Sequence, residues 1–275
     1  MTWSLAYCTL DRSPMFGQPE TLEAQVRLAA DAGFAFVTPD IFSLRAYAAT
    51  HGGSVGSLGS VAEASGIRMH DINSVTITAD RQASLAELDE LLGYTDELGA
   101  TWVQSRLLED TLEVRQVYAD AAKRVAAAGY GFSFEHSPFS PIKTLRRAED
   151  FVRQMSSFAP RQGLVIDTWH FFRGGDTFED LRALDPALFA YVQFDDALPA
   201  GPDLRFDTLN RRALPGTGEL PLGEFLTVCT ECGLEGVLSV ELVNEGLRTL
   251  DLATYVPAIH RAAASTIAAT ETPRY

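Results

Sequence analysis

Short apolar, β-branched runs alternate along this chain with longer stretches in which apolar residues recur every three or four positions. The short runs have the length of strands, and the longer stretches have the periodicity of amphipathic helices. Eight runs predict strands: Ser4 to Cys8, Phe36 to Thr38, Ile67 to Met69, Trp102 to Gln104, Phe132 to Phe134, Leu164 to Ile166, Ala190 to Phe194, and Val237 to Val240. The order of strand and helix therefore repeats over the whole sequence.

The stretches between these runs predict helices that end shortly before the next strand. They include Leu22 to Ala32, Leu85 to Leu98, Val114 to Ala128, Ile142 to Met155, and Phe225 to Cys232. Several end at a glycine, such as Gly33 and Gly99, which can adopt the left-handed conformation of a helix C-cap. Eight such units, with no Gly-x-Gly-x-x-Gly turn after the first strand, favour a (β/α)₈ barrel over a doubly wound open sheet.

The length of 275 residues suits one barrel, so we expect a single domain over residues 1–275. Within it, residues 265–275 are expected to form a frayed tail. The segment from Asp195 to Leu222 is rich in proline and glycine and much longer than a usual strand-to-helix connection of ~2 to 6 residues. We therefore expect this segment to cover a binding site.

Four polar side chains stand where the last four predicted strands end: Glu135, Asp167, Gln193 and Glu241. In a barrel of parallel strands these ends meet at one rim, where distant residues can converge on one point. Three carboxylates and an amide oxygen are ligands that hard cations prefer, whereas zinc sites usually recruit His or Cys. The sequence therefore predicts a site for one divalent ion, Mn²⁺ or Mg²⁺.

The charge balance excludes several kinds of partner. Twenty-two basic residues against 37 acidic ones give a net charge of −15, which repels nucleic acid and anionic lipid surfaces. No charged leader precedes an apolar core, and no apolar stretch approaches the ~20 residues of a membrane helix. We expect a cytoplasmic protein without a nucleic-acid or membrane partner. Three cysteines are too few for a disulfide framework, so Cys229 and Cys232 are expected to be structural thiols.

Two classes of barrel enzyme are disfavoured by composition. Schiff-base aldolases need a lysine at a strand end, but Lys123 and Lys143 both fall in predicted helices. Metal-dependent apurinic endonucleases need more histidines than the five present and a basic groove for DNA. A sugar-binding protein without catalytic activity remains an alternative at this point.

Four segments resemble the sugar phosphate isomerase/epimerase family, whose members are xylose isomerase-like TIM barrels. These segments are Phe134-Glu135-His136-Ser137-Pro138-Phe139, Leu164-Val165-Ile166-Asp167-Thr168-Trp169-His170-Phe171, Tyr191-Val192-Gln193-Phe194-Asp195-Asp196-Ala197, and Leu238-Ser239-Val240-Glu241. The resemblance extends from about Trp3 to the final helix. It implies that the four polar residues at the strand ends hold one divalent ion and that His170 contacts the substrate or the ion.

The resemblance also implies an enzyme that acts on a polyhydroxy carbonyl compound through an enediolate. One departure concerns Gln193, because sugar epimerases of this family usually have His there, whereas metal-dependent 3-dehydroshikimate dehydratases can have Gln. The first expectation is an isomerase or epimerase of a keto-sugar. The alternative is a lyase that either resembles 3-dehydroshikimate dehydratase or cleaves a 3-keto-glycoside. Relatives commonly form dimers or tetramers, so a homo-oligomer is an open expectation.

Candidate catalytic residues follow from this chemistry. Glu135 and Glu241 would serve both as ligands and as acid/base groups on opposite faces of the substrate, with His170 orienting a hydroxyl. We expect His136, which follows Glu135, to point away from it because side chains alternate along a strand.

Four further residues are candidates for substrate binding. His70 follows the third predicted strand and either enters the site or forms ordinary hydrogen bonds at the barrel mouth. Trp169 either packs in the core or forms a wall that excludes water. Arg211 and Arg212 lie in the long segment, where a guanidinium suits carboxylate or phosphate recognition, and the alternative is a solvated loop charge. The resemblance implies that Arg212 reaches a substrate oxygen.

Overall fold

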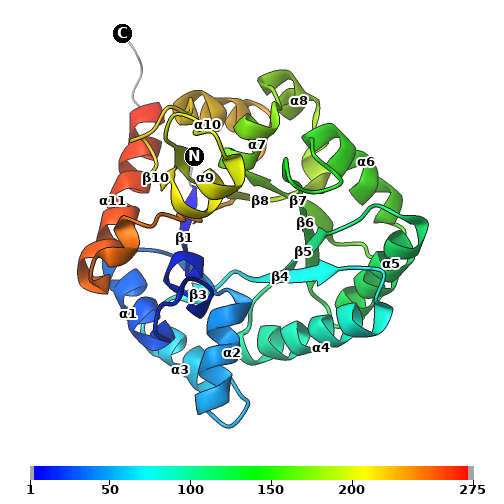
Figure 1. Cartoon of the computed structure of the whole chain (residues 1–275), viewed down its shortest axis with the longest axis horizontal. Coiled ribbons are helices and arrows are strands. Elements are labelled where there is room, and N and C mark those ends of the chain that lie inside the picture. Colours follow the sequence, from blue (N-terminus) through cyan, green and yellow to red (C-terminus); the bar gives the residue numbers. More distant parts are fainter. Residues whose placement is uncertain (1–2, 272–275) are drawn as a thin grey trace.

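The computed structural model describes residues 3–271 and shows a nearly closed barrel of parallel strands surrounded by helices (Figure 1). The strands of the barrel follow the spatial order β3-β2-β1-β11-β8-β7-β6-β5-β4. Their bounds are β1 (Ser4–Cys8), β2 (Phe36–Thr38), β3 (Arg68–Met69), β4 (Asp71–Ile77), β5 (Trp102–Leu107), β6 (Gly131–Glu135), β7 (Gln162–Asp167), β8 (Phe189–Gln193) and β11 (Val237–Val240). The predicted barrel is confirmed.

The third barrel strand is interrupted at His70, which separates β3 from β4. The carbonyl oxygen of His70 accepts hydrogen bonds from the backbone amides of both Thr101 and Trp102, so the chain changes partner there from β2 to β5. A parallel bridge between Asp40 and Asn73 links the two edges of the sheet. The eight expected strands are therefore present, one of them as two short pieces.

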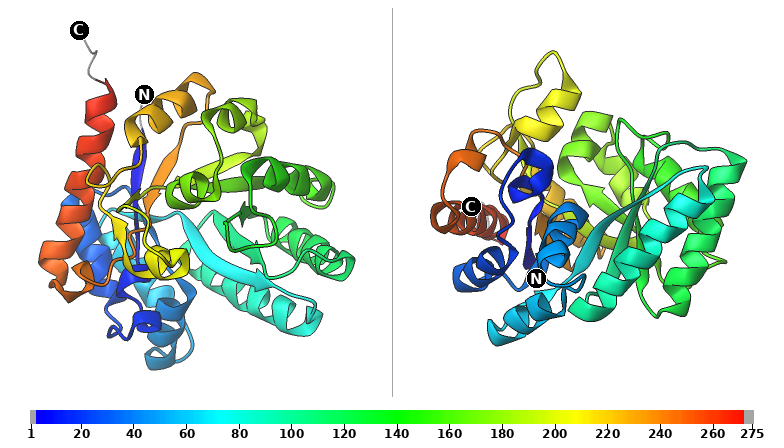
Figure 2. Two further views of the ribbon diagram at one scale, coloured as in Figure 1. Left: turned by 45° about the horizontal axis from the view of Figure 1, so that its top comes forward. Right: turned by 60° about the horizontal axis from the view of Figure 1, so that its bottom comes forward.

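Helices form the outer ring of the barrel (Figures 1 and 2). Their bounds are α1 (Leu22–Ala32), α2 (Ile41–Thr50), α3 (Gly56–Ala64), α4 (Arg81–Leu98), α5 (Leu112–Ala127), α6 (Leu145–Met155), α7 (Thr168–Gly174), α8 (Phe178–Ala183), α10 (Leu222–Glu231) and α11 (Leu252–Glu271). Helix α11 packs against α1 and α10, and its helical backbone includes residues 265–271 of the expected tail. The remaining tail residues, 272–275, lie outside the described part of the chain. Between residues 3 and 271, no helix has the length and apolar character needed to cross a membrane.

The interior of the barrel changes from apolar to polar along its axis. Near the amino-terminal ends of the strands, a small apolar layer contains Ala6, Val165, Tyr191 and Val237. The main apolar core lies between the sheet and the surrounding helices. The next interior positions toward the carboxyl ends are polar, so the barrel has a polar mouth above an apolar base.

The long segment 195–222, which we call the lid segment, is ordered and stands out from one end of the barrel (Figure 2). It contains the antiparallel pair β9 (Asp196–Ala197) and β10 (Arg212–Ala213), with α9 (Leu204–Asn210) between them. The buried Asp196 carboxylate accepts hydrogen bonds from the backbone amides of Gly216, Gly218 and Leu220. A Cβ atom on Gly218 would lie 2.3 Å from the carbonyl oxygen of Ala197, so the close approach requires glycine.

Candidate metal centre

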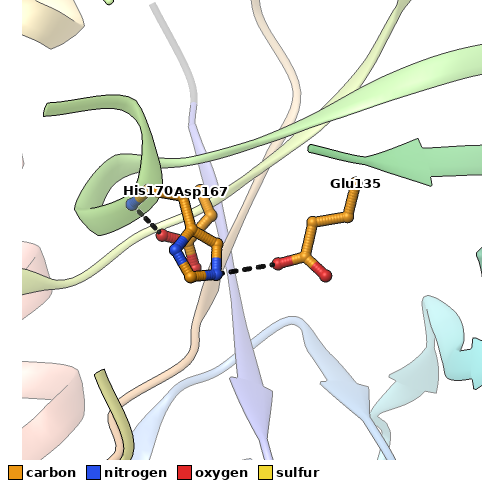
Figure 3. Close-up of side chains that lie close together, drawn as sticks. All are labelled: Glu135, Asp167 and His170. Carbon is orange, nitrogen blue, oxygen red and sulfur yellow. Dashed lines mark hydrogen bonds and ion pairs between the residues drawn. The ribbon is translucent and has the colours of Figure 1, made fainter. Parts of the chain in front are cut away.

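Glu135, Asp167 and His170 come together at the mouth of the barrel (Figure 3). Glu135 ends β6, Asp167 ends β7, and His170 lies in the first turn of α7. One donor atom from each residue lies within 4.8 Å of the others. Asp167 caps α7, because its Oδ1 accepts a hydrogen bond of 2.7 Å from the His170 backbone amide. The His170 Nε2 atom lies 3.5 Å from Glu135 Oε1, so the helix start holds the imidazole against the strand-end carboxylate.

Gln193 and Glu241 join this cluster through the interior of the barrel. Gln193 Nε2 donates hydrogen bonds to Glu241 Oε2 and, at 3.4 Å, to Gln104 Oε1. Gln104 Nε2 in turn donates to Glu135 Oε2 at 2.9 Å. The Arg212 Nη1 atom lies 2.7 Å from Asp167 Oδ2 and 3.4 Å from the Glu241 carbonyl oxygen. The four residues predicted from the strand ends therefore belong to one connected, largely buried network.

The donor set fits a divalent cation. Among residues 3–271, no group hydrogen-bonds to the buried Oε1 atom of Gln193 or to the buried Nδ1 atom of His170. An unpartnered buried polar atom costs about 1–3 kcal/mol, so a missing partner is expected at such a position. Glu135, Asp167 and His170 offer two carboxylates and an imidazole close together. Gln193 and Glu241 add an amide oxygen and a third carboxylate to the connected network, and hard cations prefer such oxygen donors.

The electrostatics of the cluster also favour a cation. Burial, reinforced by the negative charge of Asp167, raises the pKa of Glu135 to about 7. Burial likewise raises the pKa of Glu241 well above its ordinary value, although Arg212 opposes this rise. Burial alone would raise the pKa of Asp167 too, but Arg212 and, in the acidic range where its ring is protonated, His170 hold it below its ordinary value. A bound cation would relieve the repulsion between these carboxylates.

His170 is a neutral base at neutral pH. Burial lowers the pKa of its imidazole to about 4, and the nearby Arg212 guanidinium acts in the same direction. A neutral imidazole can accept a hydrogen bond or bind a metal ion through a ring nitrogen. His170 can therefore orient a hydroxyl or serve as an additional ligand.

Arg212 reaches the cluster from the lid segment. Its buried guanidinium lies 2.7 Å from Asp167 Oδ2 and 2.7 Å from Asp195 Oδ2. The salt bridge with Asp195 holds the guanidinium beside Asp167. Arg211 points elsewhere, since its Nη1 atom bonds Asp207 Oδ1 at 2.8 Å within the lid segment. Arg212, unlike Arg211, is thus placed beside the candidate ligands.

The two other substrate-binding candidates lie below and beside the centre. His70 Nδ1 lies 2.9 Å from Asp71 Oδ1, and its ring meets the Tyr191 ring edge-on at 4.8 Å. Trp169 is buried, with its ring centroid 5.5 Å from that of His170 and 5.8 Å from the Arg212 guanidinium carbon. Trp169 therefore packs directly beside the site, and His70 belongs to the polar layer under it.

His136 points away from the centre, as the alternation of side chains predicts. Its Nε2 atom lies 3.0 Å from Asp176 Oδ2, and Asp176 Oδ1 accepts a hydrogen bond from the Leu145 amide at the start of α6. The pair thus joins the loop after β6 to the loop after α7. This contact supports the position of the backbone that carries Glu135.

Comparison with known proteins gives the same fold. A family model described as a xylose isomerase-like TIM barrel matches residues 26–266. The chain belongs to this family. Among solved structures, that of the IolI protein with a bound zinc atom superimposes on this xylose isomerase-like barrel with a TM-score of 0.84. The match is 19% identical in sequence and covers 98% of this chain and all of that one, so it supports the fold.

Two curated relatives of this xylose isomerase-like barrel are enzymes. The inosose isomerase of Bacillus subtilis (strain 168) is 27% identical over 142 residues, which cover 51% of this chain and 49% of the relative. The 3-dehydroshikimate dehydratase of Pseudomonas aeruginosa is 26% identical over 172 residues, which cover 60% of this chain and 27% of the relative. The chain thus spans about half or less of the length of these relatives.

Two residues of β5 in this xylose isomerase-like barrel lie at the site without having been predicted there. Gln104 contacts both Glu135 and Gln193, and Arg106 lies two positions further along the same strand face. The Arg106 Nε atom donates to Thr76 Oγ1 at 3.0 Å, and its positive charge opposes the rise in the pKa of Glu135. The apolar run predicted a strand that ended at Gln104, before Arg106. The alternation of Trp102, Gln104 and Arg106 along the chain was the signal that the strand continues and that these side chains share one face.

Proposed function

We propose that this chain is a divalent-metal-dependent isomerase or epimerase that acts on a keto-sugar or related polyhydroxy carbonyl compound through an enediolate. The observation that carries this proposal is the convergence of two carboxylates with raised pKa values, the buried Glu241 and the partly buried Glu135, on one side-chain network. Their strands are separated in the sheet by β7 and β8, so the two carboxylates approach the mouth from different directions. The inosose isomerase relatives support a substrate with a carbonyl among hydroxyl groups.

Four residues would hold the ion: Glu135, Asp167, Glu241 and the Oε1 atom of Gln193. When bound, a divalent ion polarises the substrate carbonyl and stabilises the negative charge of an enediolate. Oxygen donors favour Mn²⁺ or Mg²⁺. The zinc atom of the IolI structure supports a divalent ion in a barrel of this kind.

The protein groups would move the proton and shield the reaction from water. One of Glu135 and Glu241 removes the proton beside the carbonyl, and the other returns it from a different direction, which yields the epimer. His170 would orient a substrate hydroxyl, and the buried Trp169 ring would exclude water from that side.

A metal-dependent lyase is the second candidate, and Arg106 is the observation that favours it. Arg106 is exposed at the mouth, and within residues 3–271 no carboxylate pairs with its guanidinium. A free guanidinium beside the site would bind a carboxylate on an acidic substrate. With the same enolisation, loss of a β-hydroxyl would give dehydration, as the name of the 3-dehydroshikimate dehydratase relatives states for those proteins. Cleavage of a 3-keto-glycoside would use the same first step.

One experiment separates these reactions. The protein is stripped of metal, reloaded with Mn²⁺, Mg²⁺ or Zn²⁺, and incubated in D₂O with a ketohexose, an inosose, 3-dehydroshikimate or a 3-keto-glycoside. We expect metal-dependent deuterium incorporation beside the carbonyl and formation of an epimer or isomer, followed by NMR. An aromatic acid formed from 3-dehydroshikimate, or a sugar released from the glycoside, would instead assign a lyase. If the protein binds a ligand but no deuterium enters it with any of the metals, the proposed enzymatic activity is refuted and a sugar-binding protein is favoured.

A further inference from the structure

Gln193 can serve as a ligand only if its amide points the correct way. The Oε1 atom can bind a cation, whereas the Nε2 group carries two hydrogens and cannot. The two ends of the amide are similar in size, so packing alone does not choose between them. Hydrogen-bond partners must therefore determine which end faces the ion.

The partners of Gln104 make that choice. A Glu135 carboxylate that binds a cation is ionised and only accepts hydrogen bonds, so the 2.9 Å contact with its Oε2 atom requires Nε2 of Gln104. The opposite end of the Gln104 amide, Oε1, then faces Gln193 and accepts from its Nε2 atom at 3.4 Å. The second hydrogen of Gln193 Nε2 goes to Glu241 Oε2. Both hydrogens are thereby used, and Oε1 of Gln193 is left without a partner among residues 3–271.

The position of Gln104 is fixed from below by a buried polar layer. Tyr191 Oη lies 3.2 Å from Gln104 Oε1 and 2.8 Å from Asp71 Oδ2. Asp71 also accepts a hydrogen bond from Thr38 Oγ1 at 2.8 Å. Each of these side chains is buried. These contacts hold the Gln104 side chain in place, and the contact with Glu135 decides which end of its amide faces Gln193.

We propose that Gln104 is a positioning residue that holds the Gln193 amide with its oxygen toward the ion, and thereby favours Mn²⁺ and Mg²⁺ over Zn²⁺. The inference rests on the metal centre of the proposed function. Zn²⁺ depends less on this oxygen, because Glu135, Asp167 and His170 already offer three donor atoms close together. Loss of Gln104 should therefore weaken Mn²⁺ and Mg²⁺ binding more than Zn²⁺ binding.

The test is a double-mutant cycle read by metal affinity. Gln104→Met keeps a similar side-chain volume and removes the hydrogen bonds of the amide to Glu135, Gln193 and Tyr191. Gln193→His replaces the amide by an imidazole that has no oxygen end to orient. Affinities for Mn²⁺, Mg²⁺ and Zn²⁺ are measured by isothermal titration calorimetry on metal-stripped protein. We expect Gln104→Met to lower Mn²⁺ affinity about 10- to 100-fold. Gln104→Met should lower Zn²⁺ affinity less than Mn²⁺ affinity. When Gln193→His is already present, Gln104→Met should lower Mn²⁺ affinity less than it does in the wild-type background.

The matched control is Gln162→Met, which removes another buried glutamine at the far end of β7, where it bonds the Met155 carbonyl. This variant should leave all three affinities unchanged. Equal losses for Mn²⁺ and Zn²⁺ in both backgrounds, or no loss at all, would overturn the role of Gln104. A wild-type protein that binds none of the three ions would instead refute the metal centre and the proposed function with it.

A second measurement applies if Gln104→Met does not fold. A crystal structure of the Mn²⁺-loaded wild-type protein should show Gln193 Oε1 bound to the ion and Gln104 within hydrogen-bond distance of both Glu135 and Gln193. A Gln104 side chain turned away from Gln193 in that structure would overturn the proposal.

Discussion

At the scale of single residues, Glu241 combines the two roles that the proposed chemistry needs. Its carboxylate is buried, accepts from Gln193 Nε2, and has a pKa well above its ordinary value, chiefly because of burial. Replacement by Gln keeps the shape and removes the negative charge and the proton acceptor. We expect Glu241→Gln to lower kcat by about 10²–10⁴-fold, the usual contribution of a general acid or base.

The same variant should fold as well as the wild type. Glu241 lies near the negative charges of Glu135 and Asp167, so neutralising it removes repulsion and the melting temperature should stay equal or rise. Circular dichroism and thermal denaturation check the fold, and deuterium exchange into the substrate checks catalysis. A Glu241→Gln enzyme with near-normal kcat would refute the assignment.

Glu135 links ion binding to pH. Because its pKa is raised to about 7 in the metal-free protein, Glu135 carries a proton below that pH, and ion binding must displace the proton. We therefore expect the apparent Mn²⁺ affinity to fall by about tenfold per pH unit as the pH drops below 7, and to level off above it. Calorimetry in buffers of different ionisation enthalpy should also detect proton release on binding at pH 6. An affinity that does not change between pH 6 and pH 8 would contradict the raised pKa.

Arg106 distinguishes acidic from neutral substrates. Its guanidinium has no carboxylate partner within residues 3–271, so it is available to pair with an acidic group on the substrate. If the lyase candidate is correct, Arg106→Gln should raise KM for 3-dehydroshikimate about tenfold or more, because a charge-assisted bond contributes about 1.5–3 kcal/mol. KM for a neutral keto-sugar should not change.

The control for this prediction is Arg261→Gln, which removes an exposed arginine from the middle of α11. That variant should leave both KM values at the wild-type level. An Arg106→Gln variant that impairs neutral and acidic substrates equally would mean that Arg106 supports the site without recognising an anion.

The four ligand candidates were predictable from the sequence, and their connections were not. Strand ends can be located from apolar runs, and parallel strands bring those ends to one rim, so Glu135 and Glu241 could be placed together. The part played by Gln104 depends on which atoms of two amides face each other, and linear sequence does not contain that information. Likewise, Arg211 and Arg212 are adjacent in sequence, yet only Arg212 turns toward Asp167.

At the scale of elements, the lid segment depends on one buried carboxylate. Asp196 Oδ2 accepts from the amides of Gly216 and Gly218, and Oδ1 accepts from the amide of Leu220. Asp196→Ala should therefore loosen residues 212–220 and raise their amide hydrogen exchange by about tenfold or more, since each bond to a charged group contributes about 1.5–3 kcal/mol. Because Arg212 belongs to this segment, KM should rise as well.

Asp203→Ala is the control within the same lid segment. Asp203 caps α9 through the amides of Arg205 and Phe206, and its loss should affect only that helix. Hydrogen exchange measured by mass spectrometry separates the two effects. Faster exchange over the whole lid segment in both variants would show that Asp196 has no special anchoring role.

The regular elements could be predicted because their apolar periodicity is strong, and the break in the third strand could not. The predicted run ended at Met69, whereas β4 continues from Asp71 to Ile77 after the interruption at His70. Asp71 and Asn73 are polar residues in the interior of the barrel, so they end the apolar pattern although the backbone remains extended. The buried polar layer under the candidate metal centre therefore hides the strand from a prediction based on apolar residues.

At the scale of the whole molecule, the barrel must bring the two ends of the chain together before the site can form. Strand β1 pairs with β11 in parallel, and β11 in turn pairs with β8, whose Gln193 contacts Glu241. A buried carboxylate reinforces the junction, since Asp11 Oδ1 accepts from Arg248 Nε and from the Asn244 amide, and Oδ2 accepts from Tyr255 Oη. These contacts join segments more than 230 residues apart.

Asp11→Ala should therefore destabilise the entire barrel and leave the chemistry of the centre intact. Removal of one partner from a buried ion pair typically costs about 3–5 kcal/mol, which is a large part of the stability of a domain. Urea denaturation should show this loss, while Mn²⁺ affinity at low denaturant should match that of the wild type. Asp251→Ala, which removes an exposed cap of Thr254 nearby, should lose far less. If Asp11→Ala has the same urea midpoint of unfolding as the wild type, the Asp11 contacts do not stabilise the junction, and strand pairing and apolar packing alone close the barrel.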